Sequence, residues 1–70
     1  SLLLARRAFD EKLRAETEIR SIFDAADGRD LTGEELASVD RLDGEVRSLG
    51  DRVSELMEQE QRSRDAADAL

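Results

Sequence analysis

A short segment at positions 27–36, Asp-Gly-Arg-Asp-Leu-Thr-Gly-Glu-Glu-Leu, combines a signal that ends one helix with signals that begin another. Gly28 has no Cβ, so it can adopt the positive φ of a left-handed cap. Thr32 and Glu35 have the spacing of a capping box, in which each side chain accepts a hydrogen bond from the other residue's backbone N–H. The sequence therefore predicts two helices joined by a tight turn.

Neighbouring residues strengthen the start of the second helix. Leu31 and Leu36 have the spacing of a hydrophobic staple across the cap. Glu34 and Glu35 place negative charge in the first turn, where the helix dipole is positive. The predicted turn and capping residues are Gly28, Arg29, Asp30, Leu31, Thr32, Glu34, Glu35 and Leu36.

The predicted fold is an all-α, antiparallel two-helix hairpin of coiled-coil type. Residues 1–70 form a single segment, with helices at about 2–27 and 33–65 and a turn at 28–32. The stretch 2–26 has no Pro or Gly and is rich in good helix formers. Apolar residues at steps of three and four predict one buried stripe on this helix, with Phe9 and Phe23 as its bulkiest members. The stripe is Ala5, Phe9, Leu13, Ala15, Ile19, either Ile22 or Phe23, and Ala26.

The second helix carries a heptad repeat with Val at one core position and Leu at the other. This combination favours parallel two-stranded association, although the first helix competes for the same surface. The partner is therefore either the first helix or another copy. The predicted self-association seam is Val39, Leu42, Val46, Leu49, Val53 and Leu56. Beyond Leu56 the seam positions become polar or small, so we expect the last turns to fray or to continue into a following segment.

Two glycines interrupt the second helix, where each costs ~1 kcal/mol relative to Ala. Gly44 falls on the outer face and is expected to be simply tolerated. Gly50 flanks the seam, where it is either tolerated as well or lets a neighbouring helix approach closely.

The composition argues against an enzyme. The chain has no Cys and no His, which removes disulfides, thiolate zinc sites and the commonest proton shuttle at neutral pH. We expect neither a catalytic residue nor a cofactor. A 70-residue chain also has a thin core, so self-association or tethering is the expected source of added stability.

The net charge of −7 is unevenly distributed: residues 2–26 carry five basic and five acidic groups, and residues 27–70 carry six and thirteen. An acidic surface repels phosphate backbones and anionic lipids, so we expect no binding to nucleic acid or membranes. No apolar run approaches the ~20 residues of a membrane span. We therefore expect a soluble intracellular chain.

The turn has the outline of a calcium-binding EF-hand loop, from Asp24 to Glu35. A working loop needs oxygen ligands at positions three and five and a glycine at six. Here those positions hold Ala26, Gly28 and Arg29. Two ligands are missing and a cation stands beside them, so we predict no metal site and attribute these residues to helix capping.

The turn at 28–35 and the pattern that follows it resemble the amino-terminal scaffolding region, the delta domain, of Hong Kong 97-type major capsid proteins of tailed phages. Those regions have a helix, an Arg-Asp-Leu-Thr-x-Glu-Glu turn and a second, heptad-bearing helix. The matching positions of the second helix are Asp40, Leu42, Glu45, Val46, Leu49, Arg52 and Val53. The resemblance covers about residues 8–60; Gly33, Gly44 and Gly50 stand where better helix formers are common.

The resemblance implies a covalently attached scaffold that guides coat subunits into a procapsid and is then removed by a maturation protease. Its expected partners are other copies of itself, neighbouring capsid subunits and that protease. Its expected location is the procapsid interior or the host bacterial cytoplasm. The turn residues would orient the second helix, and the seam would carry self-association. The alternative is a generic dimerisation or adaptor hairpin of a bacterial protein.

Overall fold

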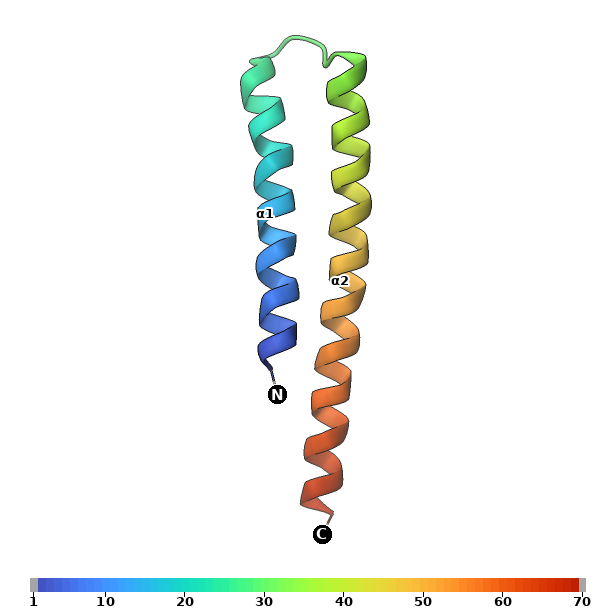
Figure 1. The fold of residues 1–70 in the computed structure, drawn as a ribbon. Coiled ribbons are helices and arrows are strands. Elements are labelled where there is room, and N and C mark those ends of the chain that lie inside the picture. Colours follow the sequence, from blue (N-terminus) through green and yellow to red (C-terminus); the bar gives the residue numbers. More distant parts are fainter. Residues whose placement is uncertain (1, 70) are drawn as a thin grey trace.

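A computed structural model describes residues 2–69 as two helices packed side by side in opposite directions (Figure 1). α1 spans Leu3–Ala26 and α2 spans Gly33–Asp68. The described residues form a rod of 60 × 15 × 14 Å. The predicted all-α antiparallel hairpin is confirmed. α2 is the longer helix and projects past the start of α1 (Figure 1).

The first helix ends through two successive residues with positive φ. Asp27 has φ 48° and Gly28 has φ 84°. The Asp27 N–H donates to the Phe23 carbonyl at 3.2 Å, and the Arg29 N–H donates to the Ala26 carbonyl at 3.0 Å. Gly28 adopts the left-handed conformation expected of it. Asp27 adopts it too, and Asp is one of the few residues besides Gly that tolerate it.

The second helix begins with the predicted capping box. Thr32 is extended, with φ −67° and ψ 165°. Its Oγ1 accepts from the Glu35 N–H at 3.1 Å, and its own N–H donates to Glu35 Oε1 at 2.9 Å. Two backbone donors that the helix cannot satisfy internally are thereby satisfied locally.

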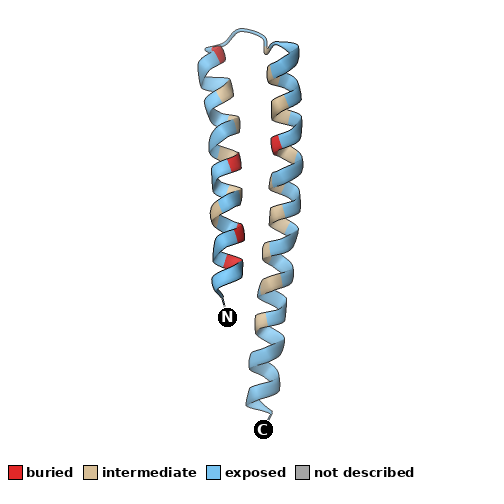
Figure 2. Cartoon of the chain, viewed as in Figure 1, coloured by how far each residue is buried: buried red, intermediate tan, exposed pale blue. Residues whose placement is uncertain are grey.

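The most deeply buried positions of the contact are small residues on α1 and a large one on α2. The buried residues, drawn in red in Figure 2, line the facing edges of the two helices. They are Ala5, Ala8, Ala15 and Ala26 of α1 and Leu42 of α2. Alanine side chains let two helix backbones approach closely, and the Val and Leu side chains of α2 fill the remaining space.

The predicted stripe of α1 is wrong at its bulkiest members. Phe9, Leu13 and Phe23 are 43%, 45% and 52% exposed. Ala8 is buried and Lys12 half-buried where Phe9 and Leu13 were expected. The observed stripe keeps alternating steps of three and four along its whole length: Ala5, Ala8, Lys12, Ala15, Ile19, Ile22 and Ala26. Phe9 and Phe23 each come one position after a residue of this stripe, so they lie to one side of it.

α2 remains helical well beyond its contact with α1. From position 61 to position 69 every residue is exposed, because α1 no longer lies opposite (Figure 2). The expected fading of the buried stripe after Leu56 is therefore observed. The final turns nevertheless keep helical geometry through Asp68.

Candidate functional site: the open side of the hairpin

The predicted seam of α2 lies against α1. Leu42 is only 2% exposed. The other five members, Val39, Val46, Leu49, Val53 and Leu56, are half-buried. The seam is therefore the inner surface of one hairpin, and its use between copies stays a prediction. Of the two partners that the sequence left open, the structure places the first helix against it.

A second set of large apolar side chains is left exposed along one long side of the hairpin. Leu2, Phe9 and Phe23 are separated by multiples of seven residues and so share one edge of α1, with Leu13 beside them. Leu36 and Met57 share one edge of α2 in the same way. We call these residues the apolar side: Leu2, Phe9, Leu13, Phe23, Leu36 and Met57.

An open groove joins the two edges near the amino terminus of α1. It has a volume of about 370 Å³ and a mainly apolar lining. Phe9 and Met57 form its walls from the two helices, and Val53 of the seam lies at its base. The apolar side is thus continuous across α1 and α2 at this end, and the seam Val is accessible through it.

A second groove of about 310 Å³ opens toward the turn end of the hairpin. Phe23 and Val46 supply apolar surface here, while Glu16, Arg20 and Asp43 supply charge. The middle of the apolar side is therefore polar, and both signs of charge occur in it.

Lys12 links that charged middle to the core. It occupies a facing position of α1, and its Nζ lies 3.4 Å from Glu16 Oε1. Its Cε passes 3.7 Å from the point where a Cβ on Gly50 would lie. That separation is ordinary van der Waals contact, so the space beside Gly50 accepts a methyl group. Gly44 has nothing within 4 Å of such a Cβ. Within the hairpin, the approach of α1 to α2 therefore does not require either glycine.

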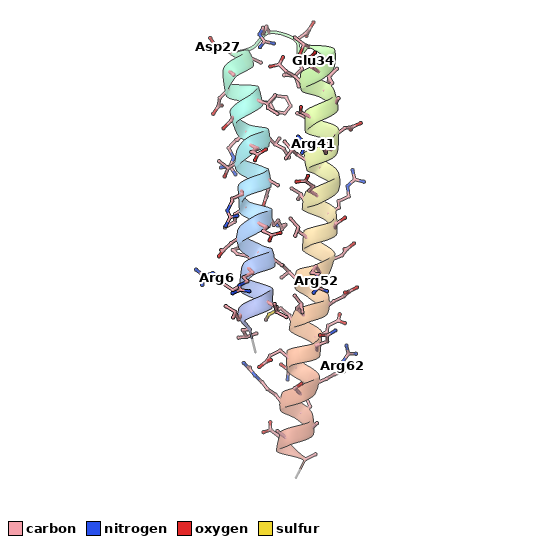
Figure 3. All side chains as sticks on the ribbon, viewed as in Figure 1. Arg6, Asp27, Glu34, Arg41, Arg52 and Arg62 are labelled. Atoms are coloured by element: carbon pink, nitrogen blue, oxygen red, sulfur yellow. The ribbon has the colours of Figure 1, made fainter. Side chains whose placement is uncertain are left out.

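The opposite long side of the hairpin has a different character. Residues spaced by seven along its two edges are mostly polar: Glu11 and Glu18 on α1, between Leu4 and Ala25, and Ser38, Glu45, Arg52 and Gln59 on α2. We call these residues the polar side. Charged side chains also cover the outer faces of both helices, as Arg6 and Arg62 illustrate (Figure 3). The large apolar side chains thus favour one side of a rod that is otherwise well solvated.

The turn contains an ion pair that the sequence analysis missed. Arg29 Nη1 lies 2.7 Å from Glu35 Oε1, and Nη2 donates to Oε2 at 3.1 Å. Arg29 also donates to the Asp30 carbonyl at 3.0 Å. The guanidinium, together with the Thr32 N–H, lowers the pKa of Glu35 to about 2. A spacing of six residues is not a helical one, so only the turn geometry brings Arg29 and Glu35 together.

Within residues 2–69, no three or more Asp, Glu, His or Cys side chains lie close enough together to hold a metal ion. Asp24 and Glu35, which suggested a calcium loop, are engaged differently: Glu35 serves the cap and Arg29, and Asp24 is an exposed residue of α1. Neither described helix has an apolar stretch long enough to cross a membrane.

Together these features define a capped two-helix hairpin with one apolar side. Comparisons with protein-family models, curated proteins and solved structures find no match for this chain.

Proposed function

We propose that this chain is a scaffolding segment of a phage coat protein, and that it acts by association of helical hairpins. The observation that carries the proposal is the distribution of apolar residues. The described chain buries four alanines and one leucine and leaves eight large apolar side chains exposed, six of which form the apolar side. A hairpin with so thin a core gains stability when that side is covered.

The turn supports the same proposal because it carries the resemblance to delta domains. Arg29, Thr32 and Glu35, which match the turn pattern of that family, form one connected set of hydrogen bonds. Such a set fixes the direction in which α2 leaves the turn. This geometry supports the orienting role that the resemblance implies for these residues.

Scaffolding also suits weak association. Segments tethered to a growing shell reach effective concentrations in the millimolar range, so a contact that is weak between free chains becomes populated in the assembly. Neighbouring coat subunits would supply that tether. A maturation protease would remove the segment from the procapsid interior. Residues 61–69 at the end of α2 are exposed.

Sedimentation equilibrium over a wide concentration range, with circular dichroism on the same samples, tests the association. We expect helicity and average mass to rise together and reversibly with concentration. A stably helical monomer at every concentration would contradict the scaffold mechanism and favour the adaptor hairpin, which binds a different protein.

The assignment to capsid assembly needs a second experiment. The complete gene product that contains this segment is expressed with and without residues 1–70, and its particles are examined by electron microscopy. We expect closed shells of uniform size only when the segment is present. Mass spectrometry of mature particles should then find the segment missing. Uniform shells in both cases would refute the assignment.

A further inference from the structure

We propose that a second copy of this chain docks on the apolar side, with the turns of both hairpins at the same end, to form a four-helix bundle. In this arrangement α1 of each copy lies across α2 of the other. The inference rests on the proposed function, because it names the partner and the surface through which the hairpins associate.

The first argument is where the uncovered apolar surface lies. The seam is already packed against α1, and the polar side offers mainly charged or polar edges. The apolar side exposes Phe9, Phe23 and Met57 at 43%, 52% and 49%. These side chains border grooves that the seam residues Val46 and Val53 also line. A partner that presents large side chains of its own fills such grooves, and a second copy presents the same set.

The second argument is the level of each residue, meaning its position along the long axis of the rod. Arg20 and Asp43 line one groove, so they lie at the same level on opposite helices. Phe9 and Met57 line the other groove and also share a level. A two-fold axis parallel to the rod preserves levels and places α1 over the partner's α2. It therefore sets Arg20 against the partner's Asp43 and Phe9 against the partner's Met57.

A further pair follows from the same register. Glu16 lies in the groove with Val46, and Arg47 is the next residue of α2. The two-fold axis brings Glu16 toward the partner's Arg47. Both contacts join opposite charges, and symmetry makes each of them twice. Glu16 lines the same groove as Asp43, so this register also brings Glu16 near the partner's Asp43. Lys12 Nζ, 3.4 Å from Glu16 Oε1, offsets that repulsion. Complementary charge of this kind selects one docking geometry over others.

The competing geometry has the turns at opposite ends and sets α1 against the partner's α1. In that geometry, apolar side chains meet along the α1 edge when Phe9 packs against the partner's Phe23. Residue 16 lies midway between them, so Glu16 then faces the partner's Glu16. This arrangement also lacks the contacts between Arg20 and the partner's Asp43, so they do not offset that repulsion. The arrangement with turns together also sends both α2 ends in one direction, as tethering to adjacent coat subunits requires.

A mixing experiment tests the arrangement. Arg20→Asp and Asp43→Arg chains are prepared separately, and their self-association is measured by sedimentation equilibrium beside the unchanged protein. Each variant alone places like charges across both symmetric contacts, so we expect association weaker by at least about tenfold. Mixed in equal amounts, the two variants form opposite-charge pairs at both contacts. We expect the mixture to regain association close to that of the unchanged protein.

Arg52→Asp is the matched control, because it makes the same charge change on the polar side. It should leave association within about twofold of the unchanged protein. An effect as large as that of Arg20→Asp would mean that association depends on the net charge of the chain and not on the contact at Arg20. That result would overturn the proposal. Mixing cannot repair a defect inside one hairpin, so recovery in the mixture identifies a contact between copies.

The relative direction of the hairpins has its own measurement. The chain contains no Cys, so an Asp30→Cys substitution in the turn gives one labelling site per copy. Donor-labelled and acceptor-labelled chains should show high energy transfer when mixed, because the turns lie together. Low transfer in an associated sample, or a mixture of charge variants that fails to recover, would overturn the docking geometry. Failure of the unchanged protein to associate would instead refute the proposed function itself.

Discussion

The turn and the helix–helix contact of this hairpin are specified in different ways. The turn is determined by residues within nine positions of one another, through a left-handed cap, a capping box and the Arg29–Glu35 pair. The contact depends on residues far apart in sequence and buries mainly alanines. The direction of the chain is therefore encoded locally and strongly, whereas the strength of packing within one copy is low. Docking of a second copy, as proposed above, would add packing energy and leave the fold of each hairpin largely unchanged.

The largest effect should follow a substitution at the centre of the weak contact. Leu42→Ala removes the most deeply buried large side chain, which is 2% exposed. We expect a loss of about 2–5 kcal/mol in the free energy of unfolding, since the cavity adds to the lost transfer energy. In so small a domain this loss unfolds much of the population. Chemical denaturation followed by circular dichroism, at a concentration where the chain is monomeric, measures it.

Leu4→Ala is the control for that experiment. Leu4 is 51% exposed and borders a groove beside Leu56, so its truncation should cost about 1 kcal/mol or less, well below the loss at Leu42. Equal losses for the two leucines would mean that Leu42 has no special place in the contact. The contrast between a locally fixed turn and a packed core centred on α2 would then be wrong.

A smaller effect is expected at the turn. Thr32→Ala removes the Oγ1 that accepts from the Glu35 N–H at 3.1 Å, and should cost ~1 kcal/mol. Thr32→Ser keeps that acceptor and should be nearly neutral. Denaturation midpoints of the two variants give the comparison. A loss above that of Leu42→Ala would mean that the turn, and not the helix–helix contact, is the main determinant of stability.

These differences follow the limits of sequence reasoning. The capping box and the left-handed Gly28 could be predicted because each depends on residues at most three positions apart. The seam could be predicted because α2 has one dominant apolar repeat. The Arg29–Glu35 pair could not, because its spacing becomes a contact only after the chain turns.

The buried stripe of α1 could not be chosen correctly for another reason. Two stripes overlap on that helix, one containing Phe9 and Phe23 and the other containing Ala8 and Ala15. Hydrophobicity alone favours the aromatic stripe. Packing favours the small one, because the facing surface of α2 already carries bulky Val and Leu side chains. Phe9, Leu13 and Phe23, the predicted core residues that are exposed, all belong to the apolar side, so the error itself marks the surface proposed for docking.

Substitution of the glycines of α2 should increase stability, unlike the changes at Leu42 and Thr32. Gly44→Ala should raise the free energy of unfolding by about 0.5–1 kcal/mol, because Ala is the better helix former and nothing lies within 4 Å of its Cβ. Gly50→Ala should give a similar gain, with its Cβ 3.7 Å from Lys12 Cε. Thermal or chemical denaturation measures both. A loss of stability for Gly50→Ala alone would show that close packing requires this glycine.

The smallest effect should appear in the pH dependence of the turn. The pKa of Glu35 is about 2 in the folded hairpin, below its ordinary value of 4.5. A lowered folded-state pKa means that ionised Glu35 stabilises the fold above pH 4.5, and that this contribution is lost as the pH falls toward 2. The pair is exposed to solvent, so screening keeps the contribution small and added salt reduces it further.

Glu35→Gln isolates this contribution, because Gln keeps an acceptor for the Thr32 N–H but carries no charge. Melting temperatures of both proteins are recorded by circular dichroism from pH 5 to pH 2. The other carboxylates titrate in both, so the difference between the two curves reports Glu35. That difference should be largest near pH 5 and should shrink as the pH falls. A constant difference would mean that ionisation of Glu35 adds nothing to the stability of the turn.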